Sequence, residues 1–371
     1  MNKDRDIFCI APFVNFSTTT QGKARLCCQA HTYQDLSVQE KSLDEIWFSD
    51  QYRSARNKFI SNEWPDECIR CQTNESKGIS SRREVENGRW SHIDIEEIIK
   101  QPRVVTYDLR MGHTCNLKCI MCTPINSSLW VAEHEQYEHL QDHKTNQRHK
   151  WADNTDLLDD IKNRLDQVEM FYFSGGEPLL NKKHEELINY CVDSGYADKI
   201  KLIYDTNATM ITQKWVDLWE NFKGVQINLS IDGGKEVVEY VRYPVKYSDL
   251  ITSLELLQSS TTIIYVALQM ALGAYNIFEV DNIYALKEKY NCRTVNISIL
   301  NWPDFLSLDV LTDDQKREVK QRYSNFNKIP RVMTFVNSIE LNGNSPQKMI
   351  EYFEKLDKVR GLDYKKVFKW L

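Results

Sequence analysis

Alternation between short β-rich runs and amphipathic helical stretches organises the chain from residue 104 to residue 300. Runs rich in Val, Ile, Tyr and Phe that alternate with helices indicate a parallel sheet built from β-α units. Six such units fit an open or partial barrel better than a closed eightfold barrel. The predicted strands are Val104–Arg110, Glu169–Ser174, Lys201–Asp205, Val225–Ile231, Ile263–Ala271 and Thr294–Leu300.

Helical patterns separate these runs and continue after them. Beyond a turn at Asn301-Trp302-Pro303 the pattern is helical only, which predicts a mainly helical C-terminal extension. The predicted helices are Thr155–Leu165, Lys182–Ser194, Thr212–Phe222, Ser248–Ser259, Phe278–Tyr290, Thr312–Phe326 and Pro346–Val359.

Length and composition describe a globular chain. At 371 residues it is long enough for one large domain and one or two smaller pieces. A formal net charge of −6 gives no reason to expect nucleic acid as a partner. The charged start lacks the apolar core of a signal peptide, and the longest apolar run, 263–272, is too short to span a bilayer. We therefore expect a cytoplasmic protein with no membrane partner.

The ten cysteines are distributed as in metal-binding proteins rather than as a disulfide framework. Without a secretory signal, thiols are expected to stay reduced. The cysteines form two groups, with two more standing alone. The groups are Cys9, Cys27, Cys28, Cys68 and Cys71, then Cys115, Cys119 and Cys122, and the isolated residues are Cys191 and Cys292.

The second group has the spacing CxxxCxxC. Three closely spaced cysteines can hold three irons of a cubane iron–sulfur cluster and leave the fourth iron open. Structural zinc is the natural alternative, but it usually takes four ligands, and here only His113 is nearby. A Ser-Gly-Gly-Glu-Pro run at 174–178 follows the next predicted strand and favours the iron–sulfur interpretation.

Polar motifs follow the first four predicted strands. The cysteines follow the first, Gly175-Gly176-Glu177 the second, Thr206-Asn207 the third, and Ser230-Ile231-Asp232-Gly233 ends the fourth. In parallel β/α architectures, ligands collect beyond the carboxyl ends of the strands. These motifs therefore predict one ligand-binding rim.

Together the motifs resemble the radical S-adenosylmethionine (SAM) superfamily. The resemblance implies that Cys115, Cys119 and Cys122 bind a [4Fe–4S] cluster whose open iron is chelated by the methionine moiety of SAM. It also implies an activity, in which an electron from the cluster cleaves the sulfonium C–S bond. The resulting 5′-deoxyadenosyl radical then takes a hydrogen atom from a substrate.

The resemblance further implies a set of SAM contacts. Gly175, Gly176, Glu177 and Pro178 would receive the amino group of SAM, because glycines permit close approach and a carboxylate accepts hydrogen bonds. Ser230 and Asp232 match the strand-end motif that contacts the ribose, and Arg242 lies where related enzymes place an arginine against the SAM carboxylate.

Asn207 matches a Thr-Asn-Gly pattern in which Ala208 replaces glycine, and Met121 stands where the family often has an aromatic residue. Structural alternatives remain for three of the SAM-binding candidates. Ser230 could be an N-cap, Asn207 a turn residue and Arg242 a member of a surface ion pair.

The amino-terminal cysteines resemble the SPASM/Twitch auxiliary-cluster modules of the same superfamily, although those modules are usually carboxy-terminal. The resemblance implies one auxiliary [4Fe–4S] cluster held by Cys9, Cys27, Cys68 and Cys71. Cys27 is preferred to Cys28 because of its spacing from Gly22. Four cysteines also suit structural zinc. Full thiolate ligation would make this cluster an electron relay or a structural anchor. Ser42 and Glu45 predict a capping box between these cysteines.

These expectations define three domains: an auxiliary module over 1–90, a radical SAM partial barrel over 103–302 and the helical extension over 303–371. The expected function is that of a radical SAM enzyme acting on a peptide, a protein or a small molecule. An electron donor such as flavodoxin or ferredoxin would supply electrons to the enzyme. The alternatives are a non-catalytic iron–sulfur electron carrier and a zinc-stapled interaction protein.

The catalytic acid or base is not identified by the sequence. Tyr204 and Asp205 are candidates because they lie at the expected rim. The polar segment 133–150, which carries His134, His139, His143 and His149, is interpreted as a solvated helix and loop, because its spacings do not keep three imidazoles on one helical face.

Overall fold

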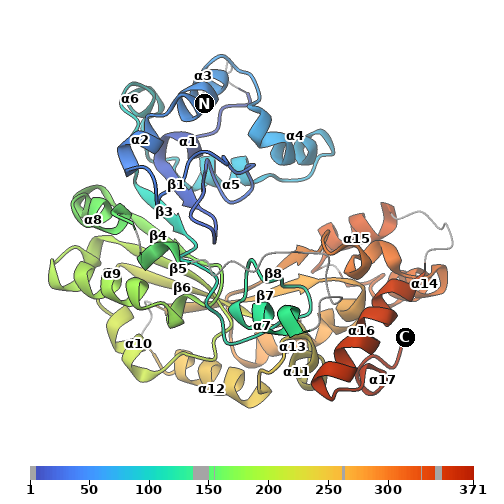
Figure 1. Ribbon diagram of the computed structural model, residues 1–371. Helices are drawn as coiled ribbons and strands as arrows, with labels where there is room; N and C mark the ends of the chain where they lie inside the picture. The colour runs from blue at the N-terminus through green and yellow to red at the C-terminus, as the bar shows by residue number, and fades with distance from the viewer. Residues whose placement is uncertain (1–5, 137–149, 154, 261–263, 327, 339–344) are drawn as a thin grey trace. The chain divides into compact units, whose positions relative to one another are not determined.

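All six predicted strands are present in the computed structural model, which describes residues 6–136, 150–153, 155–260, 264–326, 328–338 and 345–371 (Figure 1). The predicted α/β class is therefore confirmed. The strands are β3 Thr106–Leu109, β4 Met170–Phe173, β5 Lys201–Thr206, β6 Gly224–Ser230, β7 Ile264–Leu272 and β8 Thr294–Ile299.

The seven predicted helices are also present, with ends that differ by a few residues from the prediction. They are α8 Leu157–Lys162, α9 Lys182–Asp193, α10 Gln213–Trp219, α12 Tyr247–Gln258, α13 Val280–Lys289, α14 Asp313–Arg322 and α16 Gln347–Arg360. The chain divides into two compact units. Unit 1 is Met1–Thr114, Gln147–Tyr204 and Asp217–Val225, and unit 2 is Cys115–Asn146, Asp205–Val216 and Gln226–Leu371.

Unit 1 contains a sheet whose strand order is β2-β1-β3-β4-β5. Its pairs β1–β3, β3–β4 and β4–β5 are parallel, and β1–β2 is antiparallel. Neither β1 (Asn15–Thr18) nor β2 (Ala24–Arg25) is among the strands predicted from the sequence. Both strands are short, and runs of four and two residues offer too few positions for the alternation that identifies a strand in sequence.

An aromatic ladder packs across the strands of unit 1. Phe16 contacts Tyr107 with ring centroids 6.2 Å apart, and Tyr107 stacks on Phe171 at 5.8 Å. Phe173, on the same strand as Phe171, stacks on Tyr204 at 5.4 Å. Burial of this many aromatic rings stabilises the sheet on which the strand-end motifs are mounted.

The helices before β3 surround the amino-terminal cysteines. The predicted capping box is confirmed: Ser42 Oγ accepts from Glu45 N, and the Glu45 carboxylate accepts from Ser42 N. A second capping box, at Ser81 and Glu84, begins the helix that follows the cysteines. These helices are α1 Ala11–Val14, α2 Leu43–Trp47, α3 Asp50–Ile60, α4 Ile69–Ser76, α5 Arg82–Arg89 and α6 Ile95–Lys100.

Unit 2 contains the strands β6-β7-β8 in that order, with β7 and β8 parallel. The C-terminal helices pack onto this unit through aromatic side chains. Phe353 contacts Tyr240 at 5.6 Å and Phe368 at 5.2 Å between ring centroids. The remaining helices are α7 Ser128–Gln136, α11 Lys235–Val241, α15 Pro330–Ser338 and α17 Tyr364–Val367.

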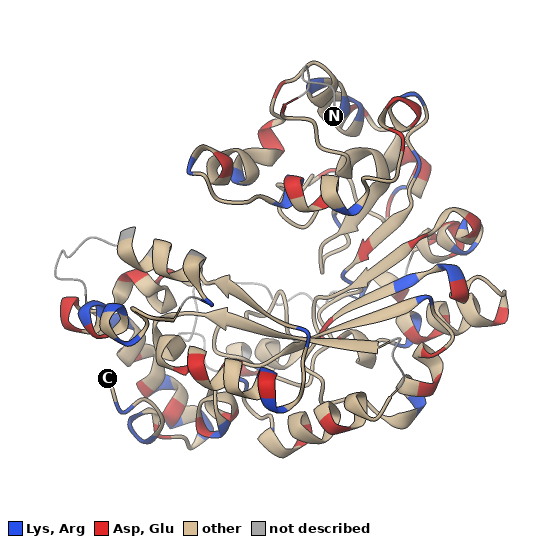
Figure 2. Ribbon diagram, turned by 180° about the vertical axis from the view of Figure 1, so that it is seen from behind, with Lys and Arg blue, Asp and Glu red and all other residues tan. Residues whose placement is uncertain are grey.

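Acidic and basic residues are interspersed on the helices of both units (Figure 2). Within the described residues, no helix combines the length and the hydropathy needed to cross a membrane. The domain boundaries expected from the sequence stay a prediction.

Candidate iron–sulfur and SAM site

The CxxxCxxC loop begins unit 2 and is held by main-chain hydrogen bonds to a distant segment. Lys118 N donates to Tyr243 O over 2.7 Å, and Ile120 N donates to Val241 O over 2.9 Å. This pairing aligns the cysteine loop with residues 241–243. The predicted ligand Arg242 lies in that segment, so the loop and this arginine are brought together by backbone geometry.

The three thiols of the loop share one environment. Cys119 is buried, and its carbonyl accepts a hydrogen bond from Trp130 Nε1 over 2.9 Å. The thiols of Cys119 and Cys122 contact each other, which lowers the pKa of Cys119 and raises that of Cys122. Cys115 is reached by Asn207, whose Nδ2 lies 3.9 Å from Cys115 Sγ.

The predicted SAM ligands Arg242 and Asp232 form a buried ion pair. Arg242 Nε lies 2.7 Å from Asp232 Oδ2, and Asp232 Oδ1 accepts from Ala271 N over 2.8 Å. Burial alone would lower the pKa of Arg242, but Asp232 and the thiolate of Cys119 raise it overall. The Asp232 side chain is fully buried, so in this arrangement it orients Arg242 rather than facing a ligand. The alternative interpretation of Arg242 as a member of a surface ion pair is therefore wrong, because its ion pair is buried.

Asn207 and Ser230 lie at the ends of β5 and β6. Asn207 Nδ2 donates to Asn116 Oδ1 over 2.8 Å, and Asn207 Oδ1 accepts from Thr209 N over 3.0 Å. Asn207 therefore links its own turn to the cysteine loop. Ala208 has φ +62°, so it adopts the left-handed conformation for which the family pattern has glycine. Ser230 is half-buried at the last position of β6.

The Gly175–Pro178 motif, which belongs to unit 1, follows β4 and packs tightly against the residues just before Cys115. Gly176 has φ +50°, and a Cβ there would lie 2.5 Å from Thr114 O. Glu177 N donates to the same Thr114 carbonyl over 2.7 Å. Close main-chain contact with 113–114 therefore requires glycine at position 176.

A small cavity lies beside this motif, lined by residues that include Ser174, Gly175, Glu177 and Pro178. Glu177 is buried, and its Oε1 accepts from Leu179 N over 3.2 Å. A carboxylate held in this way, next to a cavity, fits the predicted role of accepting from an amino group. Three of the four motif residues, Gly175, Glu177 and Pro178, thus line a recess of their own.

Tyr204 is not at a rim, which corrects its candidacy as an acid or base. It is fully buried, and burial raises the pKa of its hydroxyl. That hydroxyl lies 2.9 Å from His184 Nε2, and burial lowers the pKa of His184 to about 3. Tyr204 and His184 are therefore both neutral, and their contact is a hydrogen bond within the core. Asp205 is half-buried and accepts from Asn228 Nδ2 over 2.8 Å.

Four cysteines of the amino-terminal group line one cavity in unit 1. They are Cys9, Cys27, Cys68 and Cys71, the set expected from the sequence. Cys28 instead lines a different cavity, with Arg25 and Arg70. Four thiols around one recess are a donor set that fits a fully ligated iron–sulfur cluster. In the described part of the chain, no three His, Cys, Asp or Glu side chains are close enough to hold a single metal ion.

Protonation of these thiols depends on the cavity. Burial raises the pKa of Cys27 to about 12, with Cys28 adding to the effect, and burial also raises the pKa of Cys9. Thiols must lose their protons to ligate metal, so cluster binding and proton release are coupled here.

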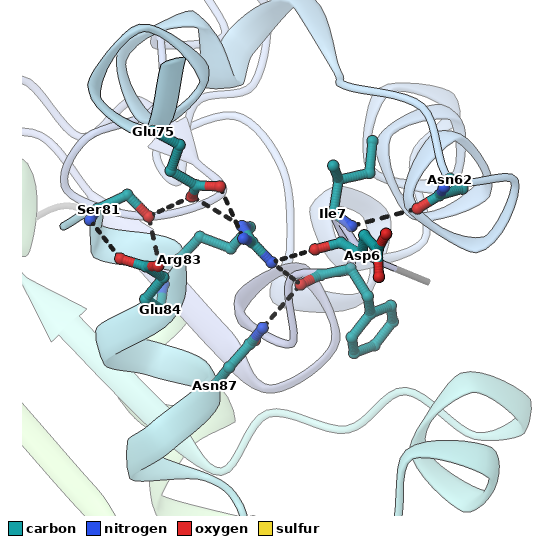
Figure 3. Close-up of polar contacts among 9 residues, drawn as sticks. Asp6, Ile7, Asn62, Glu75, Ser81, Arg83, Glu84 and Asn87 are labelled. Atoms are coloured by element: carbon teal, nitrogen blue, oxygen red, sulfur yellow. Dashed lines mark hydrogen bonds and ion pairs between the residues drawn. The ribbon is translucent and has the colours of Figure 1, made fainter. Parts of the chain in front are cut away.

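The segment that carries Cys9 is anchored by α5 (Figure 3). Arg83 donates from Nη1 to the carbonyls of Asp6 and Phe8, each over 3.0 Å, and is itself held by Glu75 through bonds of 2.8 and 2.7 Å. Asn87 Nδ2 also donates to Phe8 O, over 2.7 Å. A bidentate arginine–carboxylate pair is rigid, so it fixes the position of the residue before Cys9.

A buried network that was not predicted from the sequence supports the CxxxCxxC loop from the C-terminal helices. Arg360 Nε donates to Glu133 Oε1 over 2.9 Å, and Lys118 pairs with the same carboxylate. Tyr352 Oη donates to Ile120 O over 3.0 Å. No local pattern indicates these contacts, because α16 is more than two hundred positions away in sequence.

The expectation of a solvated segment over 133–150 is wrong at its beginning. Glu133 and His134 are both buried in unit 2. His139, His143 and His149 lie outside the described residues.

Serine at position 27 is expected to remove the iron of the auxiliary site, whereas serine at position 28 is expected to retain it. Only Cys27 shares a cavity with Cys9, Cys68 and Cys71. Iron should be counted after anaerobic reconstitution in a background with alanine at 115, 119 and 122, where Cys27→Ser should lose about four irons per chain. Equal losses in the two variants, or a loss only in Cys28→Ser, would overturn the assignment.

In the comparison with known proteins, each of the two cysteine groups lies in a region that matches a family model. Residues 109–286 match the family model of the radical SAM superfamily, and residues 9–72 match the SPASM iron–sulfur cluster-binding domain. An uncharacterised protein of Methanocaldococcus jannaschii is 29% identical over 126 residues, which are 34% of this chain and 37% of that protein.

The solved structures that match the chain do so with low identity and with TM-scores below 0.5. Native anSMEcpe with bound AdoMet has 17% identity and a TM-score of 0.43, over 65% of this chain and 63% of that chain. Streptococcus suis SuiB bound to the precursor peptide SuiA has 12% identity and a TM-score of 0.40, over 72% of this chain and 60% of that chain. The matched regions thus cover less than two thirds of each of these proteins.

The two family matches agree with the two cysteine groups and with the order of the motifs along the chain. Both families bind iron–sulfur clusters, and the first also binds SAM. The chain therefore contains a radical SAM region, residues 109–286, and a SPASM-type iron–sulfur cluster-binding domain ahead of it, residues 9–72.

Proposed function

We propose that the protein is an enzyme that uses SAM to start radical chemistry on a peptide, a protein or a small molecule. When bound at Cys115, Cys119 and Cys122, a [4Fe–4S] cluster supplies the electron that cleaves SAM to a 5′-deoxyadenosyl radical, which abstracts hydrogen from the substrate. The observation that carries the proposal is the main-chain pairing of the cysteine loop with residues 241–243.

The residues of unit 2 have separate tasks in this proposal. Arg242, oriented by Asp232, presents its guanidinium to the SAM carboxylate, a group that its planar fork suits. Asn207 keeps the turn after β5 against Cys115 and Asn116. Ser230 contacts the ribose from the end of β6. Burial of Asn207, Asp232 and Arg242 excludes water from the charges of the ion pair.

In unit 1, the Gly175–Pro178 motif binds the amino group of SAM, with Glu177 as an acceptor. The cavity lined by Cys9, Cys27, Cys68 and Cys71 holds an auxiliary [4Fe–4S] cluster. Ligation by all four thiolates would leave such a cluster without an open iron, which would suit an electron relay. Flavodoxin or ferredoxin is the proposed donor to the enzyme.

SAM cleavage tests the proposal directly. Anaerobically reconstituted, dithionite-reduced protein is expected to convert SAM to 5′-deoxyadenosine, measured by liquid chromatography. Cys119→Ala should abolish the product while iron at the auxiliary site is retained. Absence of 5′-deoxyadenosine from wild-type protein with both clusters intact would identify a non-catalytic electron carrier instead. Zinc in place of iron would identify a structural role.

A further inference from the structure

Three side chains of unit 2 form a closed ring of hydrogen bonds between the cysteine loop and the turn after β5. Asn116 Nδ2 donates to Thr209 Oγ1 over 2.7 Å. The Thr209 hydroxyl donates in turn to Asn207 Oδ1 over 2.7 Å, and Asn207 Nδ2 donates back to Asn116 Oδ1 over 2.8 Å. Each of the three side chains therefore donates once and accepts once within this ring.

The main chain determines which end of the Asn207 amide faces the cysteine loop. Thr209 N, which can only donate, lies 3.0 Å from Asn207 Oδ1. Oδ1 therefore faces Thr209, and Nδ2 is the end that faces the loop. Because Thr209 Oγ1 gives its only hydrogen to Oδ1, it accepts from Asn116, so the orientation of the Asn116 amide is determined as well.

The turn that carries Asn207 is anchored on both sides of Ala208. Ser253, a buried residue of α12, donates from Oγ to Ala208 O over 2.6 Å. Ala208 N donates to Thr206 Oγ1 over 3.0 Å. The ring is therefore built on a turn whose main chain is held in place by contacts of its own.

The ring places a side-chain donor beside the sulfur of Cys115. Leu117 N donates to Cys115 Sγ over 3.4 Å, and Asn207 Nδ2 lies 3.9 Å from the same atom. An amide nitrogen carries two hydrogens, so Asn207 Nδ2 can donate to Asn116 and to Cys115 together. Asn207 is only 7% exposed, so little water competes for these hydrogen bonds.

Hydrogen bonds to the ligating sulfurs are among the factors that set the reduction potential of an iron–sulfur cluster. Reduction adds one electron and no proton, so the negative charge on the sulfurs increases. An N–H donor interacts more strongly with the more negative, reduced form. A donor held against a ligand sulfur therefore raises the reduction potential.

We propose that Thr209 and Asn116 are positioning residues that hold the Asn207 amide as a hydrogen-bond donor to Cys115, and that this ring raises the reduction potential of the cluster at the CxxxCxxC loop. The inference rests on the proposed binding of a [4Fe–4S] cluster at Cys115, Cys119 and Cys122. Asn207 acts on the cluster ligand directly, whereas Thr209 and Asn116 act through Asn207.

Thr209→Val removes the hydroxyl of the ring and keeps the main-chain bond from Thr209 N. The potential is measured on anaerobically reconstituted full-length protein by redox titration followed by electron paramagnetic resonance. The signal of this cluster is the one that is absent from Cys119→Ala. At a fixed potential, Thr209→Val should lower the ratio of reduced to oxidised cluster about threefold. Asn207→Leu should lower it about tenfold, which is a shift of about 59 mV to lower potential.

Thr209→Ser keeps the hydroxyl and should have the wild-type potential. Comparison of the valine and serine variants decides the case in which Asn207→Leu does not bind iron. Thr334→Val is the matched control in the same unit, because Thr334 is an exposed residue of α15 whose hydroxyl donates to Pro330 O within that helix, over 2.9 Å. It should leave the potential unchanged.

The inference is overturned if Thr209→Val has the wild-type potential, or if Thr209→Ser or Thr334→Val shifts the potential as much as Thr209→Val does. The free energy of unfolding of the apoprotein is measured alongside. A lower free energy of unfolding for Thr209→Val with an unchanged potential would reduce the ring to a structural contact.

The titration is done without SAM, so it separates this inference from the proposed function. Production of 5′-deoxyadenosine by the wild type, with an unchanged potential in Thr209→Val, would overturn the role of the ring and leave the enzyme assignment standing. A lowered potential in Thr209→Val without SAM cleavage by the wild type would support the ring and remove the enzyme assignment. Absence of the cluster signal from the wild type would remove both.

Discussion

Alanine at position 176 is expected to destabilise the fold by about 2–5 kcal/mol and to reduce SAM cleavage at least tenfold. The new Cβ would lie 2.5 Å from Thr114 O and 2.9 Å from His113 C, both main-chain atoms. Main chain cannot move aside as a flexible side chain can. The next residue along the chain is Cys115, so a shift of 113–114 disturbs the first cluster ligand.

Gly195→Ala is the matched control for this variant. Gly195 also has a positive φ, +75°, but a Cβ there would meet nothing within 4 Å. The Gly195→Ala substitution should therefore lower the free energy of unfolding only by the left-handed backbone penalty of about 1–2 kcal/mol and leave SAM cleavage unchanged. Chemical denaturation and 5′-deoxyadenosine production measure the two effects. Equal behaviour of the two variants would show that contact with 113–114 is not what position 176 requires.

Methionine at position 360 is expected to destabilise the protein by about 1.5–3 kcal/mol, because it removes one of two cations that pair with the buried Glu133 carboxylate and leaves Lys118 as the other. The Arg360 side chain is 1% exposed and that of Glu133 is 2% exposed. Arg360 also stacks on the rings of Trp130 and Tyr243, 4.8 and 5.1 Å from their centroids. Trp130 donates to the Cys119 carbonyl, so we expect iron loading at the CxxxCxxC loop to fall as well.

A double-mutant cycle tests whether the pair, rather than either residue alone, is responsible. Glu133→Gln combined with Arg360→Met should cost clearly less than the sum of the single changes. Arg317→Met, which removes an exposed pair with Asp314, should change the free energy of unfolding by less than about 0.5 kcal/mol. Additive single effects would mean that α16 does not stabilise the loop through this ion pair.

Local sequence order predicted the strand-end motifs because each depends on only a few consecutive residues. A polar run after a β-rich run identifies the cysteine loop, the Gly-Gly-Glu-Pro motif and the end of β6 without knowledge of their partners. The same reasoning failed for Tyr204. Its position at the end of β5 suggested access to a ligand, but an alternating strand points successive side chains to opposite faces, and Tyr204 points into the aromatic core.

Sequence by itself determined the α/β class, the two cysteine groups and the superfamily, since spacing along the chain encodes all three. Tertiary structure decided which thiols share a cavity, because Cys27 and Cys28 are neighbours in sequence and line different cavities. It also decided that β1 and β2 join the sheet of unit 1. Finally, it brought α16 to the cysteine loop, where the Tyr352–Ile120 bond joins residues 232 positions apart. Contacts of that kind depend on packing between distant segments, for which spacing along the chain carries no signal.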